Sequence, residues 1–191
     1  MAEDRSATPP PAAERIHAER ILIVVDVQKG FVTPASGHVL EPIESVQYDF
    51  DKVIFTKFHN PDPSPFRRIL NYCKLAPESE DTQLAIEARD DAVIIARPLY
   101  TCVTKELRDL LRSWGTDEVY IAGIATEACV LKTVIDLFEY DIRPWVLADL
   151  CASDKGPRFH DMALELIASL VGTQHVVSSQ SLSADAPAGA G

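Results

Sequence analysis

Cysteine is scarce in this sequence, and the cysteines present do not form a recognisable framework. Cys73, Cys102, Cys129 and Cys151 are scattered through 191 residues without C-x-x-C or His-rich spacing. Neither a zinc site nor a set of disulfides is therefore indicated. Thiols without disulfide partners are typical of a reducing compartment, so we expect a cytoplasmic protein.

Long hydrophobic runs are also lacking. The longest apolar stretches are far too short to cross a membrane. The first residues are rich in Pro, Ala and charged side chains and contain no apolar region typical of a signal peptide. We therefore expect no membrane association and no export.

Basic residues are fewer than acidic residues. The chain has 18 Lys and Arg against 29 Asp and Glu, which gives a net charge of -11. This balance argues against nucleic acid or an anionic membrane surface as the main partner. It leaves a cationic small molecule open as a substrate.

The length of the chain suits one domain with a sizeable core. We expect this domain at residues 19–180, between two disordered tails at 1–18 and 181–191 that are rich in Pro, Ala, Ser or charge. There is no internal repeat and no interior linker. Hydrophobic residues make up 47% of the sequence, which is ordinary for a globular protein.

Strand-like runs alternate with helical patterns along the domain. The runs typical of strands cover residues 21–25, 53–56, 93–95, 119–121, 145–147 and 175–177. Helical patterns cover 65–74 with Ser64 as the cap, 81–89, a segment that begins at Thr101 or Thr104, a segment that begins at Thr126, and 157–171. The alternation predicts a three-layer α/β fold, with a six-stranded parallel sheet flanked by helices on both faces.

The segment that follows the fourth predicted strand carries a cysteine at a helix start. Gly123 allows a tight turn, Thr126 suits an N-cap and Glu127 suits the positive helix end. Cys129 then falls in the first turn, where the helix dipole favours a thiolate, although a packing role is equally compatible with this stretch alone. A core-facing stripe is expected from Val130, Leu131, Val134, Ile135 and Phe138.

Three reactive residues follow three different predicted strands. Asp26 ends the first strand, Arg97 ends the third, and Cys129 follows the fourth. Parallel strands bring such residues to one edge of the sheet, where α/β proteins hold their ligands. This convergence favours a catalytic interpretation of Cys129 over a packing role.

Several of these pieces resemble one family. Val25-Asp26-Val27-Gln28, the run from Gly123 to Val130, and Asp149 with Cys151-Ala152-Ser153 are similar to the cysteine hydrolases of the isochorismatase-like superfamily, which includes nicotinamidase and carbamoyl-sarcosine amidase. The resemblance covers roughly residues 21–177. It implies a Rossmann-like fold, a small-molecule substrate, no cofactor, and a homo-oligomer, either a dimer or a tetramer.

The resemblance also implies roles for individual residues. Cys129 would be the nucleophile, Asp26 the general acid and base, and Arg97 would stand in place of the family's lysine. A cis peptide bond is implied at Ile124–Ala125, and the backbone N–H groups of Ala125 and Cys129 would form an oxyanion hole. Arginine keeps the lysine's charge but does not release a proton near neutral pH, so a structural ion pair with Asp26 is the alternative role for Arg97.

A second departure from the family concerns metal. Nicotinamidases resemble one another in an Asp-x-His followed by another His, whereas this chain has Lys57-Phe58-His59 and then Pro61-Asp62-Pro63. Too few ligands remain for a transition metal, so we expect none and do not expect nicotinamide as the substrate. His59 is instead expected to form hydrogen bonds in the substrate pocket.

Other side chains near the strand ends have more ordinary interpretations. Phe31 and Tyr100 are expected to line the pocket, and Trp114 to join the core. Cys102 and Cys151 are expected in loops beside Cys129, as packing residues or as redox partners. Asp154 and Lys155 are expected to be solvated charges.

Three hypotheses for the function remain. The first is a metal-independent cysteine amidohydrolase that cleaves a C–N bond of a small amide, ureido compound or lactam through a Cys129 acyl-enzyme. The second is a catalytically impaired family member that acts as a binding or assembly protein. The third is a thiol redox protein that uses Cys129 with Cys102 or Cys151.

Overall fold

A computed structural model describes residues 19–184. Its six strands form one sheet in the order β3-β2-β1-β4-β5-β6, and every neighbouring pair is parallel. The strands are β1 (Ile21–Val25), β2 (Lys52–Phe58), β3 (Val93–Arg97), β4 (Glu118–Ile124), β5 (Arg143–Ala152) and β6 (Val176–Val177). The predicted six-stranded parallel α/β fold is confirmed.

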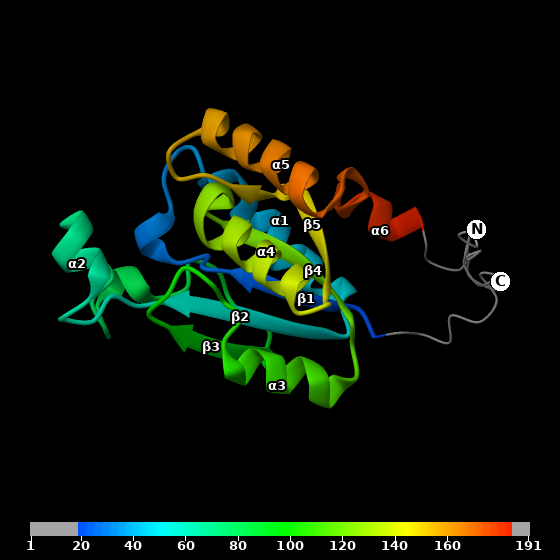
Figure 1. The fold of residues 1–191 in the computed structure, drawn as a ribbon, viewed down its shortest axis with the longest axis horizontal. Helices are drawn as coiled ribbons and strands as arrows, with labels where there is room; N and C mark the ends of the chain where they lie inside the picture. Colours follow the sequence, from blue (N-terminus) through cyan, green and yellow to red (C-terminus); the bar gives the residue numbers. More distant parts are fainter. Residues whose placement is uncertain (1–18, 185–191) are drawn as a thin grey trace, which may run out of the picture.

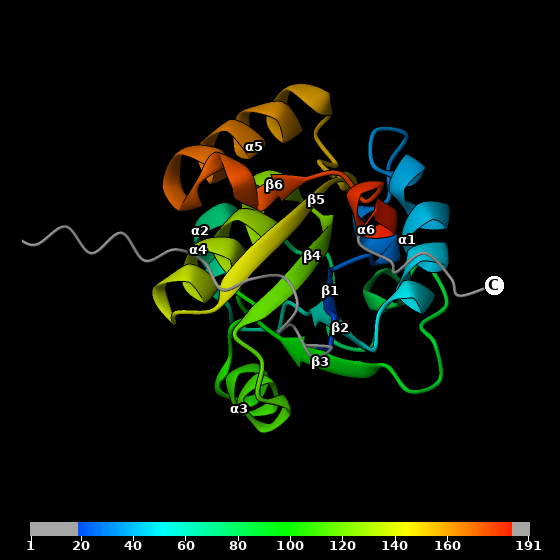
Figure 2. The same ribbon diagram turned by 90° about the vertical axis from the view of Figure 1, so that its right-hand side faces the viewer.

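Helices cover both faces of the sheet. One face carries α3 (Lys105–Trp114), α4 (Leu131–Glu139) and α5 (Pro157–Val171), and the other carries α1 (Leu40–Val46) and the short α6 (Ser181–Ala184) (Figure 2). The remaining helix, α2 (Pro65–Leu70), lies beyond the carboxyl ends of β2 and β3 (Figure 1). It is therefore at the sheet edge where the reactive residues were expected.

Strand β1 lies at the centre of the sheet and is apolar because both of its faces are covered. All five of its residues have 0% exposure. Ile21, Ile23 and Val25 join the core under α3, α4 and α5, whereas Leu22 and Val24 join the core under α1. A strand buried on both faces needs apolar side chains in both directions, which explains the unbroken run.

Gly123 allows β4 to pass close to β1 near the carboxyl edge. Its φ is +130°, and a Cβ atom there would lie 2.1 Å from the backbone oxygen of Val25. No side chain fits in that space, and L residues rarely adopt this backbone conformation. Glycine therefore brings the end of β4 directly beside the end of β1.

The prediction of a helix at residues 81–89 is wrong. This part of the chain forms a single 3-10 turn at Glu80–Thr82 and then runs extended beside the end of β1. The Ala85 N–H donates to the Val27 carbonyl at 2.9 Å, and Gln28 forms an isolated antiparallel bridge with Leu84. These tertiary backbone hydrogen bonds replace the bonds that a helix would make internally.

Several predicted boundaries also shift. Ser64 caps α2 and Thr104 caps α3 through the N–H groups of Arg67 and Leu107, as expected. However, α2 ends at Leu70, because Asn71 takes a left-handed conformation with φ of 53°. Strand β5 continues through Cys151 and Ala152, which were expected in a loop.

The apolar stripe of α4 includes Val130, Leu131 and Val134 as predicted, but the predicted Ile135 is only partly buried and lies outside the core. Leu137 is fully buried, whereas Phe138 is 53% exposed. Both i+3 and i+4 neighbours of Val134 lie on its side of a helix, and the sheet packs against the i+3 neighbour. Trp114, expected in the core, is partly buried against it.

The predicted C-terminal tail begins too early, because Ser181–Ala184 form α6 and Leu182 is buried against the core. The rest of that predicted tail and the predicted N-terminal tail lie outside the described residues. Within residues 19–184, no helix is long and apolar enough to span a membrane.

Candidate active site

Cys129 lies on an unusual turn between β4 and α4. The Ile124–Ala125 peptide bond is cis, and Thr126–Val130 form one turn of π-helix before α4 begins. Thr126 does not cap this turn, contrary to the prediction, because its hydroxyl hydrogen-bonds to His160 Nδ1 on α5 at 2.8 Å. Single π turns are frequent at functional sites.

The Cys129 thiol is buried and protonated rather than a ready thiolate. Cys129 is only 5% exposed. Burial raises the pKa of Cys129 well above 9.0, and the nearby Asp26 carboxylate raises it further, against the opposing effect of Arg97. The expected stabilisation of a thiolate by the helix start is therefore wrong, because desolvation outweighs it.

Asp26 ends β1 in a left-handed conformation, with φ of 50°. The carboxylate is fully buried. The Thr56 hydroxyl donates to Oδ1 at 2.9 Å, and Arg97 Nη2 donates to Oδ2 at 2.6 Å. Because each oxygen has a fixed donor, the orientation of the carboxylate is set by β2 and β3.

Arg97 ends β3 and is only 1% exposed. Its Nη2 also lies 3.2 Å from the Tyr100 carbonyl oxygen and 3.2 Å from Cys102 Sγ. Burial is the largest single effect on the pKa of Arg97 and acts to lower it, but the combined effects of Asp26, Cys102 and Cys129 raise the pKa, so the guanidinium stays charged. Within residues 19–184, its Nε and Nη1 atoms have no hydrogen-bond partner.

Gln28 supports the site, a role that was not predicted from the sequence. Its amide nitrogen donates to the carbonyls of Phe58 and Thr82 at 2.9 and 2.8 Å, and its oxygen accepts from the Phe58 N–H at 2.8 Å. These bonds join the ends of β1 and β2 to the extended segment. Its position two residues after Asp26 was the signal in the sequence that could have identified it.

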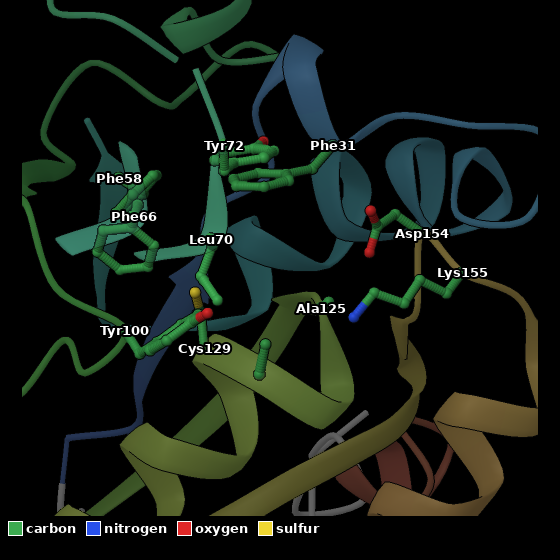
Figure 3. Close-up of a pocket in the computed structure, with 11 residues that line it drawn as sticks. Phe31, Phe58, Phe66, Leu70, Tyr72, Tyr100, Ala125, Cys129, Asp154 and Lys155 are labelled. Atoms are coloured by element: carbon green, nitrogen blue, oxygen red, sulfur yellow. The ribbon is translucent and has the colours of Figure 1, made fainter. Parts of the chain in front are cut away.

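A cavity of about 260 Å³ opens above Cys129 (Figure 3). Side chains from six separate segments line it: Phe31, Phe58, Phe66, Leu70, Tyr72, Tyr100, Ala125, Ala128, Cys129, Asp154 and Lys155. The structure thus places Phe31 and Tyr100 beside Cys129. It does not place His59 there, since His59 lies at a different hollow together with Lys57 and Pro77.

Lys155 is exposed, as expected for a solvated charge, whereas Asp154 is only partly exposed. The loop after β5 brings both to the cavity, and burial, followed by the charge of Glu127, raises the pKa of Asp154. Lys155 Nζ lies 3.4 Å from Glu127 Oε1, which also accepts from the Ser153 hydroxyl at 3.0 Å. Their position just after a strand end was the only hint in the sequence.

The other two buried cysteines differ in their surroundings. Cys102 follows β3, and its Sγ donates to the Thr56 hydroxyl at 3.2 Å, beside Arg97. Cys151 lies within β5 rather than in a loop, with Sγ 3.8 Å from the Ile121 carbonyl oxygen. Burial raises the pKa of Cys151 to about 12, which fits a packing residue.

The residues near β2 do not fit the metal site of nicotinamidases. Lys57 brings a cation to the place where the resemblance puts a carboxylate ligand. Burial, with a smaller effect from Arg97, lowers the pKa of His59. Within residues 19–184, no three His, Cys, Asp or Glu side chains are grouped so that they could hold a metal ion.

The fold and the site define a class of protein. It is a three-layer α/β protein with a buried Cys–Asp–Arg group at the carboxyl edge of a parallel sheet, under an aromatic cavity. The chain belongs to the isochorismatase family, whose isochorismatase domain matches residues 20–181.

Individual relatives agree with this assignment. A nicotinamidase from Acinetobacter baylyi is 25% identical over 199 residues, with 82% of this chain and 92% of that protein covered. The structure of a cysteine hydrolase from Pseudomonas syringae pv. phaseolicola has a TM-score of 0.72 at 22% identity, covering 82% of this chain and 88% of that one. A pyrazinamidase from Pyrococcus horikoshii in complex with zinc has a TM-score of 0.69 at 24% identity, covering 80% and 96%.

Proposed function

We propose that this protein is a metal-independent cysteine amidohydrolase that cleaves a C–N bond of a small amide, ureido compound or lactam. The observation that carries the proposal is the convergence of Cys129, Asp26 and Arg97 beneath one cavity. Family membership and the similarity to a nicotinamidase support the reaction class.

Asp26 is the proposed proton carrier. Since the pKa of Cys129 is raised, the thiol needs a base at the moment of attack. Asp26 takes the thiol proton as Sγ bonds to the carbonyl carbon, and then passes the proton to the departing nitrogen. The C–N bond breaks and the acyl group stays on Cys129 as a thioester; ammonia or an amine leaves, except that a lactam keeps its new amino group tethered to the acyl chain.

Water completes the proposed cycle. Asp26 takes a proton from the attacking water, the C–S bond breaks, and the sulfur recovers the proton as the carboxylic acid leaves. The backbone N–H groups of Ala125 and Cys129 are the proposed oxyanion hole. Such donors typically contribute a factor of about 10² or more in rate.

Arg97 is proposed to act by charge and position. It contacts Asp26 through Nη2 alone, so the carboxylate is held by one nitrogen and not by a two-pronged fork. A guanidinium keeps its proton near neutral pH, which leaves proton transfer to Asp26. The alternative of an impaired binding protein predicts instead that Arg97→Lys creates activity that the wild type lacks.

A panel of small amides and lactams tests the proposed function, with ammonia or amine release measured for the amides and formation of the ring-opened amino acid measured for the lactams. We expect turnover of at least one compound and its loss in Cys129→Ala. Cys73→Ala is the matched control, because Cys73 is exposed and does not line the cavity. Reversible oxidation of Cys129 with Cys102, without hydrolysis of any compound, would support the redox alternative instead.

We also propose a homo-oligomer, dimer or tetramer, on the basis of the family resemblance. An exposed apolar row on α5 supports association: Phe159, Met162, Leu166 and Leu170. Such a row on a helix is typical of a contact surface. Sedimentation velocity of the wild type and of Leu166→Glu tests it, and a monomeric wild type would contradict it.

A further inference from the structure

The cavity above Cys129 has an almost continuous aromatic wall. The ring centroids of Phe31 and Phe58 are 6.3 Å apart, those of Phe58 and Phe66 are 4.8 Å apart, and those of Phe66 and Tyr100 are 4.9 Å apart. Tyr72 adds a fifth ring beside Phe31 (Figure 3). Aromatic ring faces carry negative electrostatic potential and attract cations.

The opposite side of the cavity carries the Asp154 carboxylate (Figure 3). Within residues 19–184, Asp154 takes part in no ion pair closer than 4.0 Å, although it is half buried. Burial and the charge of Glu127 raise its pKa, while Lys155 and Lys74 act in the opposite direction. The carboxylate is thus partly desolvated without a cation in contact with it.

The neighbouring positive charge already has partners. Lys155 Nζ lies 3.4 Å from Glu127 Oε1 and 5.5 Å from the centre of the Phe159 ring. The other oxygen of Glu127 is buried and has no hydrogen-bond partner among the described residues. Beneath the cavity, Arg97 is paired with Asp26. The uncompensated charge around the cavity is therefore negative.

We infer that the substrate is a cationic amide, with a quaternary ammonium or pyridinium group held between the aromatic wall and Asp154 while its carbonyl lies at Cys129. This inference rests on the proposed function. A cavity of about 150 Å³ holds benzene, so about 260 Å³ accommodates a trimethylammonium group or one ring together with a carboxamide. The net charge of -11 also attracts such a substrate.

Two amides of the same shape test the inference. Trimethylammonioacetamide, (CH₃)₃N⁺–CH₂–CO–NH₂, and 3,3-dimethylbutanamide, (CH₃)₃C–CH₂–CO–NH₂, differ only in the charged atom. We expect kcat/KM of the wild type to be at least about tenfold higher for the cation. Asp154→Asn should reduce that preference, the ratio of the two kcat/KM values, by about tenfold.

A control and a binding measurement separate the possible outcomes. Asp90→Asn removes one carboxylate from an exposed turn away from the cavity and should leave the preference unchanged. Calorimetry with Cys129→Ala measures binding of the two amides without reaction. Tighter binding of the cation there, without turnover of any amide by the wild type, would refute the hydrolase function and support the cation site.

The opposite results overturn the cation site while the hydrolase function stands. One is turnover of the neutral amide at an equal or higher kcat/KM. Another is preferential turnover of the anionic amide succinamate, which would assign recognition to Lys155. A third is an unchanged preference in Asp154→Asn. If Cys129→Ala binds the two isosteric amides equally, the inference is wrong even without turnover.

Discussion

Arg97 Nη2 lies 2.6 Å from Asp26 Oδ2, and neither side chain is more than 1% exposed. The pair joins the ends of β1 and β3, two strands separated in the sheet by β2. A buried pair of this kind positions both members, and the loss of one leaves the other charge unpaired. We therefore expect the charge of Arg97 to be needed for the shape of the site.

Arg97→Met should lower the free energy of unfolding by about 3–5 kcal/mol, because it leaves the Asp26 carboxylate buried and unpaired. Arg97→Lys should cost less, because the native contact with Asp26 uses only one nitrogen. Urea unfolding at pH 7 measures both. Equal destabilisation by Arg97→Met and Arg97→Lys would show that the positive charge at this position does not stabilise the site.

Thr56→Val should lower kcat more than it changes KM. The Thr56 hydroxyl donates to Asp26 Oδ1 and accepts from Cys102 Sγ, but Thr56 does not line the cavity. The loss of a hydrogen bond to a buried carboxylate costs about 1–3 kcal/mol, which predicts a decrease in kcat of roughly fivefold to 150-fold. A change confined to KM would contradict this positioning role.

Alkylation of Cys129 should remain slow up to pH 9, because burial and Asp26 raise the pKa of its thiol. Asp26→Asn removes one negative charge beside the sulfur and should lower that pKa. Alkylation of Cys129 at pH 8 should then be faster, even though amide turnover is lost. Mass spectrometry can follow Cys129 against the exposed Cys73 in the same sample, and slower alkylation in Asp26→Asn would contradict the assignment.

Gly123→Ala should destabilise the protein by more than about 3 kcal/mol, a loss expected only from special mechanisms such as backbone clash. The new Cβ would lie 2.1 Å from the Val25 oxygen. Gly115→Ala is a matched control, because Gly115 also has a positive φ but no atom within 4 Å of a Cβ. It should cost only about 1–2 kcal/mol, and similar losses in both variants would argue against a close approach of β4 to β1.

The gathering of Asp26, Arg97 and the Cys129 turn at one sheet edge could be predicted from the sequence, because parallel strands place their carboxyl ends together. The raised pKa of Cys129 could not be predicted from the sequence. Local sequence shows a helix start, which favours a thiolate, but the desolvation that outweighs it depends on the packing of residues from other strands.

The cavity walls were the least predictable part. Phe66, Leu70 and Tyr72 reach Cys129 because α2 lies beyond the ends of β2 and β3, and no local pattern indicates that position. The segment 81–89 has helical spacing, but backbone pairing with Val27 and Gln28 makes it extended. In both cases, contacts with distant parts of the chain decided the structure.

The most direct test of the central claim is mass spectrometry of the protein quenched during turnover of an amide substrate. The Cys129 mechanism predicts that the peptide containing Cys129 gains the mass of the acyl group, and that Cys129→Ala neither gains it nor releases ammonia. Release of ammonia by Cys129→Ala at the wild-type rate, with no acyl mass on Cys129 in the wild type, would contradict it.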